Sequence, residues 1–393
     1  MRTESPILID ITRLILRLLK GKRATGVDRV SLAYLEYFKH RAQAVLSWHG
    51  RVVVLNASKS QTIFGKLIVD NQCDGHDKWY WMRILAYVAT FVRADKDYAG
   101  AYLFNTGHKG LESQAYTDTL KKMQVRPIFF VHDLIPLTHP EYCRAGEYEQ
   151  HQQRMLNVLN SAAGAITNSQ ATLDELIVFA QEQGILMPPS VVAPLASAKL
   201  EINPSKRLIA EPYFVVLSTI EPRKNHWMLL QVWRRLVEQM GAQTPKLLVI
   251  GQRGWECENI LDLLERCKEL KGFVIELPSC NDADLANYLH YSQALLFPSF
   301  AEGYGMPLAE ALALGVPVIA SRLPAFLEIS DDIPEFLDPL DGIAWQQHIK
   351  NYVRIDSPER QAQLQRLAHF EPSTWDEHFV QVELLFRRIS GSA

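Results

Sequence analysis

Glu302 and Glu310 stand eight positions apart in the segment "SFAEGYGMPLAEALALGVPVIAS", which covers residues 299–321. Gly303 and Gly305 lie between them, and glycine lets the backbone approach a ligand closely. A carboxylate accepts hydrogen bonds from hydroxyl groups, so two carboxylates can hold the vicinal hydroxyls of a sugar or a ribose. These residue types predict a site for a hydroxyl-rich ligand.

The flanking residues place the two glutamates around a turn between a strand and a helix. The apolar run "ALLFPS" at 294–299 predicts a strand, and "PLAEALAL" at 307–314 predicts a helix. Pro307 suits the first helical turn, and Gly315 suits the position just past the helix end. In a parallel sheet such a turn lies at the carboxyl edge, where open α/β folds bind ligands.

The start of this predicted helix offers ligands for phosphate. We expect the backbone amides of Gly305, Met306 and Leu308 to face outward, because amides at a helix N-terminus attract anions. The alternative is a capped turn with two solvated glutamates. We favour a ligand site, since a Gly-x-Gly turn, a proline and paired acids at a sheet edge share no packing purpose.

A basic pair, Arg223 and Lys224, lies in "STIEPRKN" at 218–225, directly after another predicted strand. A diphosphate leaving group gains negative charge as its bond to a sugar breaks, and fixed cations stabilise that transition state more than the ground state. The alternative is a solvated basic loop. The expected place at a carboxyl edge favours a diphosphate site, with Glu221 bracing the loop.

A second candidate site lies in the N-terminal half, where "FFVHDLIPLTHP" at 129–140 ends a predicted strand with His132 and Asp133. An isolated pair of this kind is most simply a histidine satisfied by its neighbouring aspartate. Its expected place at a carboxyl edge makes it a candidate for substrate contact instead. His139 has no such context, and we expect it to be structural.

Short apolar runs recur along the chain with helical segments between them. Each run is nearly continuous rather than alternating, which predicts strands buried on both faces of a parallel sheet. Their alternation with helices predicts an α/β fold of two doubly wound parallel sheets. The runs lie at 6–12, 51–58, 101–107, 126–134, 164–169, 190–194, 213–220, 246–252, 273–278, 294–299 and 316–321.

The polar, Pro-containing segment 194–212 predicts the seam between two domains. We therefore expect an N-terminal Rossmann-like domain at 1–197, a C-terminal one at 198–372, and a final helix at 373–393.

Capping-box spacings indicate where two helices begin. Thr172 and Glu175 predict a helix that starts at "TLDELIVFAQEQ", and Thr374 and Glu377 predict the start of the final helix. A further helix is predicted at 226–240.

The composition excludes several classes of protein. The chain has 393 residues, 48% hydrophobic and 22% charged, which suits a globular protein of two domains. Its formal net charge of -3 argues against a nucleic-acid partner. The five cysteines lack CxxC spacing and predict reduced thiols rather than zinc sites or disulfides. Without a secretory signal or a run of 18 apolar residues, a cytoplasmic location is expected.

The segment "EGYGMPLAE" at 302–310 resembles the E-x7-E signature of retaining glycosyltransferases with the GT-B fold, and glycosyltransferase family 4 most of all. The resemblance implies two Rossmann-like domains that face a cleft, the N-terminal one binding the acceptor and the C-terminal one the nucleotide sugar, with the final helix at 373–393 crossing back to the N-terminal domain. It assigns the donor sugar's hydroxyls to Glu302 and the ribose to Glu310. The residues between them, from Gly303 through Tyr304 to Leu308, would hold the sugar and the diphosphate.

Two more loops resemble elements of the same family. "STIEPRKN" is similar to its ExRKN loop, which implies that Arg223 and Lys224 bind the donor diphosphate. "IGQRGW" resembles its GxxGW element, so Gly251 and Gly254 would shape the donor pocket. Arg253 would be either a further phosphate contact or a surface residue.

In the N-terminal half, the family carries a histidine that contacts the donor sugar near its 6-hydroxyl. This implies that role for His132 and a supporting role for Asp133. "ATGVDRVSLAYL" at 24–35 resembles the family's first Gly-rich loop, where Gly26 would admit the acceptor or the diphosphate close to the backbone.

The resemblance implies transfer of a hexose, with retention of configuration, to a hydroxyl of a glycan or lipid-linked saccharide. We expect no metal or other cofactor, because no DxD-like metal site is expected at either edge of the cleft and an Arg/Lys pair can replace a metal's charge. No carboxylate is well placed as a nucleophile, so the family-based expectation is a front-face reaction in which the departing phosphate helps to deprotonate the acceptor.

The donor is first expected to be GDP-mannose, because "VHDLIPLTHPEYC" and "STIEPRKN" resemble bacterial mannosyltransferases of polysaccharide assembly. A UDP-hexose or deoxyhexose donor stays open. The chain departs from the family at 329–336, where "ISDDIPEF" replaces the usual Gly-Asp-Ala stretch beside the donor pocket. Two other classes of protein stay open as well: a GT-B sugar-nucleotide epimerase and a non-catalytic nucleotide-sugar-binding partner.

Contact with a membrane is a further expectation left open. No acid occurs from residue 11 to 24, and this basic segment is either a solvated face or a docking site for anionic lipid, at about 1 kcal/mol per charge. The aromatic segment 78–92 is expected to be a buried helix rather than an interfacial one. Docking would place the protein at the inner face of the cytoplasmic membrane. The cations of the basic segment are Arg13, Arg17, Lys20, Lys22 and Arg23.

Overall fold

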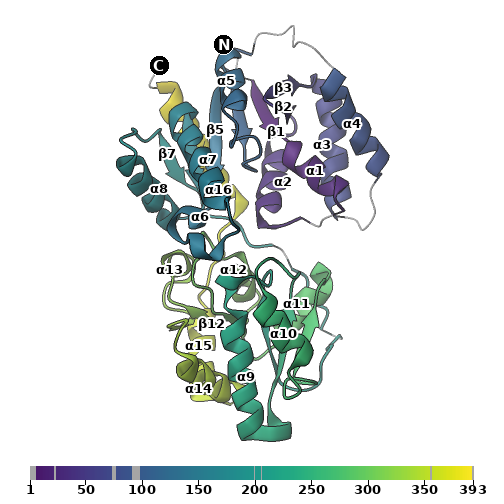
Figure 1. Ribbon diagram of the computed structural model, residues 1–393, viewed down its shortest axis with the longest axis vertical. Coiled ribbons are helices and arrows are strands. Elements are labelled where there is room, and N and C mark those ends of the chain that lie inside the picture. Colours follow the sequence, from purple (N-terminus) through teal and green to yellow (C-terminus); the bar gives the residue numbers. More distant parts are fainter. Residues whose placement is uncertain are drawn as a thin grey trace. The chain divides into compact units, whose positions relative to one another are not determined.

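The computed structural model describes residues 6–21, 24–72, 77–90, 98–198, 200–204, 206–354 and 356–391. The chain divides into two compact units, drawn in Figure 1. Unit 1 comprises Met1–Leu137, Gly146–Leu195 and Trp375–Ala393, and unit 2 comprises Thr138–Ala145 and Ala196–Thr374.

Unit 1 is built on a twisted sheet that has, among the described residues, seven strands in the order β3-β2-β1-β4-β5-β6-β7. All neighbouring strands run parallel except β2 and β3. The strands are β1 (Ile7–Asp10), β2 (Ala42–Trp48), β3 (Arg51–Val54), β4 (Tyr102–Asn105), β5 (Arg126–Val131), β6 (Gly164–Thr167) and β7 (Ser190–Val192).

The prediction of a doubly buried parallel strand at 51–58 is wrong, because β3 is an antiparallel edge strand. Its partner β2 was not predicted. The two strands are joined at His49 and Gly50, which both have positive φ (47° and 78°), as in the tight turns that link hairpin strands. A hairpin at the sheet edge needs no buried second face, so Arg51 can stay exposed.

Helices pack on both faces of the sheet in unit 1. Leu103 and Phe129 share one core with α5, α7 and α8. On the other face Phe104 and Phe130 meet Tyr34 of α2, at ring-centroid distances of 5.2 and 6.2 Å. The helices are α1 (Thr12–Leu19), α2 (Gly26–Phe38), α3 (Ala57–Gln72), α4 (Lys78–Thr90), α5 (Gln114–Lys122), α6 (Ile135–Thr138), α7 (Glu147–Ser161), α8 (Gln170–Glu182) and α16 (Trp375–Gly391).

The helix α16 completes the core of unit 1 although it comes last in the chain. It contacts β6 and β7, and its residues Phe379, Val382 and Leu385 are buried. Its neighbour Gly164 in β6 has no room for a side chain, since an added Cβ would lie 2.8 Å from Ile389 Cδ1.

The capping box predicted at Thr172 and Glu175 is wrong. The helix α8 begins two residues earlier, at Gln170, and Ser169 Oγ accepts a hydrogen bond from the Thr172 amide at 3.1 Å. Ser169 therefore takes the N-cap position, which places Thr172 inside the first turn.

The basic segment at 11–24 is not a uniformly solvated or lipid-facing surface. Arg13 Nε and Arg17 Nε lie 2.9 and 2.7 Å from the carboxylate of Asp28, which is buried in α2. The prediction failed for these two arginines because their acid comes from the next helix. Lys20 is exposed, and the other two cations, at positions 22 and 23, lie outside the described residues.

The aromatic segment predicted to be a buried helix forms α4 with one inward and one outward side. Trp81 is buried and donates through Nε1 to Asp70 Oδ2 at 2.8 Å, whereas Trp79 is 73% exposed. Positions 91–92 of this prediction lie outside the described residues.

In the described part of the chain, no helix has the length and apolar character needed to cross a bilayer. The described cysteines form no disulfide with one another, and Cys73 lies outside the described residues.

Unit 2 is built on a sheet whose described strands, six in number, run parallel in the order β10-β9-β8-β11-β12-β13. The sequence did not predict β13, a three-residue strand that is only half-buried. The strands are β8 (Tyr213–Leu217), β9 (Lys246–Ile250), β10 (Val274–Leu277), β11 (Leu295–Phe297), β12 (Val318–Ser321) and β13 (Glu335–Leu337).

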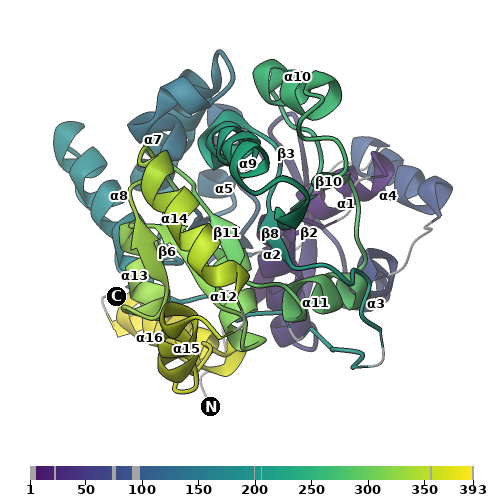
Figure 2. The same ribbon diagram turned by 90° about the horizontal axis from the view of Figure 1, so that it is seen from below.

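Alternate residues of these strands point to opposite cores. Phe214 and Val216 pack with α9 and α14, which lie side by side in Figure 2. Tyr213 and Val215 pack with α11, α12 and α13. The helices are α9 (His226–Met240), α10 (Glu258–Arg266), α11 (Asp282–His290), α12 (Met306–Ala313), α13 (Pro324–Ser330), α14 (Gly342–Val353) and α15 (Pro358–Leu367). The doubly wound α/β fold is therefore present in both units.

Neighbouring leucines of α16 provide a test of its place in the core of unit 1. Leu385 is fully buried and Leu384 is 37% exposed. We expect Leu385→Ala to lower the free energy of unfolding by about 3 kcal/mol, because it leaves a cavity. Leu384→Ala should change it by less than about 1 kcal/mol. Urea unfolding followed by circular dichroism measures both, and equal losses would contradict the packing described here.

Candidate functional site

Two loops of unit 2 bring together the residues that the sequence singled out. Arg223 and Lys224 lie on the short 3-10 turn Pro222–Lys224, which follows β8. Glu302 lies on the loop that follows β11. Because β8 and β11 are parallel neighbours, both loops leave the same carboxyl edge of the sheet.

The two cations share one carboxylate. Arg223 NH1 lies 2.8 Å from Glu302 Oε2, and Lys224 Nζ bonds to Glu302 Oε1. Arg223 NH2 lies 2.7 Å from Glu221 Oε1, so Glu221 holds the arginine from its other side, as expected for a bracing residue. The side chain of Glu302 is 9% exposed, that of Lys224 12% and that of Arg223 17%. We call these four residues the charge cluster.

The electrostatics of the charge cluster are not symmetrical. Burial raises the pKa of Glu302, but Arg223 and Lys224 outweigh it and lower that pKa to about 2. Burial and the neighbouring Arg223 lower the pKa of Lys224, against the opposing attraction of Glu302. The surroundings thus favour the charged form of the Glu302 carboxylate, whereas they disfavour the charged form of the Lys224 ammonium.

The loop that carries Glu302 leads into α12. Gly305 has φ of 124°, and an added Cβ would lie 2.6 Å from Phe326 Cε1, so only glycine fits there. The expectation that the Leu308 amide faces outward is wrong, because this amide donates to the Gly305 carbonyl at 3.0 Å. The candidate phosphate ligands at this helix start are therefore the amides of Gly305 and Met306.

The remaining predicted donor residues of this loop are more enclosed than the sequence suggested. Tyr304 and Leu308 are buried, and Glu310 is 4% exposed on the first turns of α12. Pro307 is the second residue of the helix, as expected for a first-turn proline. Glu310 therefore reaches a ribose only if a ligand enters next to the helix start.

A third loop, after β9, packs tightly against the loop after β8. Gly251 has φ of 149°, and a Cβ there would lie 2.0 Å from the Ser218 carbonyl oxygen. A Cβ on Gly254 would lie 2.7 Å from the Ile220 carbonyl oxygen. Close backbone approach accounts for both glycines, whether or not they also border a ligand.

Arg253 takes the surface role that the sequence left open. Its guanidinium lies 2.7 Å from Glu276 Oε1 and 2.6 Å from Glu265 Oε1, and its side chain is 41% exposed. Both partners belong to neighbouring elements, β10 and α10. The alternative role as a phosphate contact receives no support from this geometry.

In unit 1, His132 follows β5 and is 8% exposed. Its Nε2 lies 2.7 Å from the Thr106 carbonyl oxygen, which can only accept, so Nε2 carries the proton and Nδ1 keeps a lone pair. Burial lowers the pKa of His132 to about 4, despite the Thr106 bond and the nearby Asp133. The ring is therefore neutral and can accept a hydrogen bond from a hydroxyl. Asp133 instead accepts from the Ile135 amide at 3.2 Å.

Two histidines that the sequence did not reveal hold the same loop. His108 Nε2 lies 2.5 Å from the Phe130 carbonyl oxygen, and His151 Nε2 lies 3.2 Å from that of Asp133. Burial lowers the pKa of both rings, so they too are neutral donors. No pattern could have found them, because their partners are backbone carbonyls, which leave no trace in a sequence.

Two more polar groups surround this loop. Asn168 donates through Nδ2 to the His132 carbonyl oxygen at 2.9 Å. Burial and the charge of Asp133 raise the pKa of Glu175 in α8 to about 7. The three histidines, Asn168 and Glu175 form a mostly neutral frame around the end of β5.

Gly26 is the first residue of α2. The preceding Thr25 is the N-cap, and the buried carboxylate of Asp28 accepts from both the amide and the hydroxyl of Thr25, at 2.8 and 2.7 Å. This reciprocal capping box, which the sequence did not predict, explains the local shape of the loop. Gly26 is exposed at the helix start.

Within the described part of the chain, no group of three or more His, Cys, Asp or Glu side chains is arranged to hold a metal ion.

Comparison with known families adds information on both units. Residues 200–335 match the family model "Glycosyl transferases group 1". Residues 108–193 match the model "Glucosyltransferase 3-like, N-terminal domain". The first match contains the whole charge cluster, and the second contains the three histidines.

Three curated relatives are bacterial mannosyltransferases. The O-antigen chain mannosyltransferase B of Escherichia coli is 28% identical over 258 residues, which are 64% of this chain and 67% of the relative. The serotype-specific mannosyltransferase WbdA of the same species is 25% identical over 58% of this chain, but the match spans only 30% of WbdA. The O-antigen chain mannosyltransferase RfbU of Salmonella typhimurium is 37% identical over 37% of this chain and 39% of its own length.

Solved structures with the same fold cover nearly the whole chain. HepE of Anabaena, determined with UDP and glucose, has a TM-score of 0.64 and 15% identity over 99% of both chains. Sucrose-phosphate synthase of Thermosynechococcus elongatus has a TM-score of 0.62 and 14% identity, and covers 99% of this chain and all of that one. At these identities the likeness shows the fold alone.

The charge cluster predicts the effect of removing its carboxylate. Glu302→Gln removes the carboxylate that both buried cations share, and we expect a loss of about 3 kcal/mol in the free energy of unfolding at neutral pH. The matched control is Glu265→Gln in the exposed pair with Arg253, where the loss should stay under about 1 kcal/mol. Equal losses in the two variants would contradict the cluster.

The pH dependence of the same variant follows from the pKa of Glu302. Because that pKa falls from 4.5 in the unfolded chain to about 2 in the folded one, its stabilisation is complete above pH 4.5 and is lost as the pH falls toward 2. The stability difference between wild type and Glu302→Gln should narrow over this window. Urea titrations across the window measure it.

The neutral histidines predict a second pH effect in unit 1. The pKa of His132 falls from 6.5 in the unfolded chain to about 4 in the folded one, so the unfolded chain binds the proton first and stability is lost as the pH falls from 6.5 toward 4. Between pH 7 and 5 this loss should be about 2 kcal/mol. We expect His132→Asn to remove this part of the pH dependence of the free energy of unfolding. The control is His40→Asn, which changes an exposed histidine and should keep the wild-type dependence. The same pH dependence in wild type and both variants would argue against a buried, neutral His132.

Proposed function

We propose that the chain is a GT-B glycosyltransferase similar to bacterial mannosyltransferases, and that it moves a hexose from a nucleotide diphosphate sugar to a hydroxyl of a glycan or lipid-linked saccharide. The setting is the assembly of a bacterial polysaccharide such as an O-antigen, a capsule or an exopolysaccharide. The proposed donor is GDP-mannose, and the reaction retains the anomeric configuration, as in glycosyltransferase family 4.

The observation that carries this proposal is the buried charge cluster. Arg223 and Lys224 neutralise Glu302 when no ligand is bound. A diphosphate brings more negative charge and more acceptor oxygens than one carboxylate, so it can draw both cations to itself. Glu302 is then released to accept hydrogen bonds from the sugar's hydroxyls.

The transfer of both cations from Glu302 to the diphosphate would also promote cleavage of the bond between sugar and phosphate. As the sugar leaves, charge builds up on the diphosphate, and two fixed cations in a site sheltered from water stabilise it. The amides of Gly305 and Met306 would add partial positive charge, and Glu310 would bind the ribose. This division of roles needs no metal, and the leaving phosphate itself takes the acceptor's proton in a front-face reaction.

His132 suits the recognition of a sugar hydroxyl better than the removal of a proton. Its pKa of about 4 makes it a weak base at neutral pH, while its Nδ1 lone pair can accept a hydrogen bond. His108 and His151 would keep the ring and its loop in place. Unit 1 would thus contribute orientation, and unit 2 the charge that promotes departure.

The donor rests on the names of the relatives, which are mannosyltransferases. The N-terminal match to a glucosyltransferase 3-like domain and the fold shared with HepE keep a UDP-hexose as the alternative donor. The protein's location is proposed to be the cytoplasm, where nucleotide sugars are made. Contact with the inner face of the membrane through Lys20 and its neighbours is an additional proposal that a lipid-linked acceptor would favour.

A donor panel tests the proposal. The full chain is incubated with GDP-mannose, UDP-glucose, UDP-galactose or a dTDP-deoxyhexose, with and without a lipid-linked saccharide, and products are followed by NMR. We expect transfer from GDP-mannose with an axial donor linkage preserved in the product, and no change on addition of EDTA. An isomerised donor would show an epimerase, and binding without turnover would show a non-catalytic partner.

A lysine variant connects the activity to the charge cluster. Lys224→Ala should lower turnover by at least about 1000-fold, because the cation at the leaving group is lost. The control is Lys271→Ala, which removes an exposed lysine of unit 2 and should leave turnover unchanged. Circular dichroism verifies that both variants fold, and full activity in Lys224→Ala would contradict the proposed role.

A further inference from the structure

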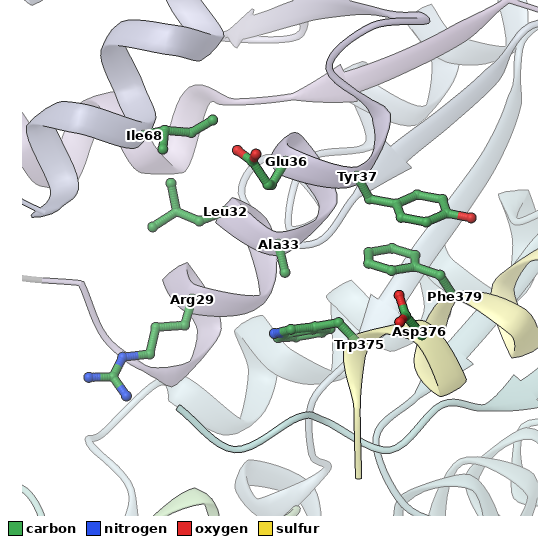
Figure 3. A pocket seen from close by; sticks show the side chains of 9 residues that line it. All are labelled: Arg29, Leu32, Ala33, Glu36, Tyr37, Ile68, Trp375, Asp376 and Phe379. Carbon is green, nitrogen blue, oxygen red and sulfur yellow. The ribbon is translucent and has the colours of Figure 1, made fainter. Parts of the chain in front are cut away.

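Two adjoining hollows lie between α2 and α16 in unit 1, and none of the residues assigned to the proposed reaction lines them. The first has a volume of about 370 Å³ and is lined by α2, by Ile68 of α3 and by the start of α16, as Figure 3 shows. The second has a volume of about 400 Å³ and lies along α16. Tyr37, Asp376 and Phe379 line both, so the hollows form one elongated groove.

We propose that this groove binds a neutral oligosaccharide, namely a stretch of the glycan acceptor remote from the hydroxyl that receives the hexose. The inference rests on the proposed function for the presence of a glycan. The groove itself is argued from its aromatic wall, its mixed charges and its two adjoining hollows.

The aromatic wall offers the surface on which a sugar ring packs. Tyr37 and Phe379 are stacked with centroids 3.8 Å apart and planes at 8°, and Trp375 lies 6.0 Å from Phe379. Phe379 is buried in this stack, whereas Tyr37 remains 41% exposed and Trp375 is half-buried, so Tyr37 and Trp375 present the accessible ring surface. A pyranose ring presents C–H groups on one face, which carry partial positive charge and fit the negative face of an aromatic ring while both lose water.

Carboxylates and guanidinium groups line the two hollows together with the aromatic residues. Glu36 and Asp376 border the first hollow, and Glu383 and Arg387 border the second. Glu36 pairs with Lys39 and Glu383 with Arg41, but both are exposed ion pairs, each contributing no more than about 1 kcal/mol. A sugar's vicinal hydroxyls can therefore replace these partners at little cost.

The groove carries both signs of charge. Glu36, Asp376 and Glu383 line it together with the guanidinium groups of Arg29 and Arg387, and Lys39 and Arg41 pair with Glu36 and Glu383. Neither sign dominates, so the groove offers no concentrated positive patch to an anionic headgroup. A neutral polyol is attracted by both signs, since its hydroxyls donate to carboxylates and accept from guanidinium groups.

The presence of two adjoining hollows favours a chain over a single small molecule. Each hollow falls within the range of about 300–1,000 Å³ found for ligand pockets. Tyr37 lines both hollows, so a ligand that filled both would pass over the exposed part of this ring. Successive sugar units could then occupy the two hollows.

Direct binding tests this inference without relying on turnover. Linear α-mannotetraose is titrated into the full chain by calorimetry, and we expect a Kd on the order of 1 mM, typical of a shallow site. Tyr37→Ala and, as a second variant that leaves the core untouched, Asp376→Asn should each weaken binding by about 10-fold. Lys224→Ala should bind as wild type does, because its change lies in the other unit.

The outcomes separate this inference from the proposed function. Absence of binding to wild type, binding unaffected by Tyr37→Ala and Asp376→Asn, or binding abolished by Lys224→Ala would each overturn the groove as a glycan site. Sedimentation with phosphatidylglycerol vesicles that is lost in Tyr37→Ala would assign the groove to a membrane surface and overturn it too. Tetrasaccharide binding without transfer from any donor would retain the groove and reject the proposed function.

If transfer occurs, the dependence of KM on acceptor length provides an independent test of the groove. In wild type, KM for a tetrasaccharide acceptor should be about 10-fold lower than for a monosaccharide, because only the longer one fills the groove. In Tyr37→Ala this advantage should disappear while kcat stays the same. An advantage that persists in the variant would contradict the inference.

Discussion

A buried carboxylate held between two cations determines how the site in unit 2 is built. Charges of this kind are tolerated away from water only when each has a partner in good geometry, and Glu302 meets Arg223 and Lys224 on a neighbouring loop. The backbone follows the same constraint, because the Phe300 amide donates to the Arg223 carbonyl at 2.9 Å and Arg223 NH1 donates to the Ala301 carbonyl at 2.6 Å. Two loops that leave adjacent strands are thereby locked together before any ligand arrives.

In unit 1, the backbone at the end of β5 is held by neutral side chains instead of ion pairs. The end of β5 and the loop that follows it have three carbonyl groups that accept from side chains, those of Phe130, His132 and Asp133, and the donors are His108, Asn168 and His151. Burial lowers the pKa of His108 and His151, so these imidazoles orient the backbone through hydrogen bonds and add no net charge. The site in unit 2 is thus built on buried ion pairs, and the end of β5 in unit 1 is held mainly by neutral hydrogen-bond donors.

The sequence predicted most strands and the residues of the charge cluster, because continuous apolar runs and a glycine turn between two acids are local features. It failed where the answer depends on a distant partner. The edge hairpin of β2 and β3 looked like a buried strand, and Arg13 and Arg17 looked unpaired because their acid, Asp28, belongs to the next helix. The ion pairs within the charge cluster were equally invisible, since nothing in the chain order joins residue 302 to residues 223 and 224.

The pairing within the charge cluster also bears on which anions could compete for it. A ligand with a single negative charge would offer the two cations no more than Glu302 already does, and it would leave the carboxylate buried without a partner, which costs several kcal/mol. A diphosphate can satisfy both cations, and an attached sugar can satisfy the released carboxylate through its hydroxyls. Under the proposed function, the internal ion pairs would therefore act as a filter that favours a ligand carrying both groups over either group alone. The depressed pKa of Glu302 supports this argument, because a carboxylate that stayed protonated would leave the cations free for any anion.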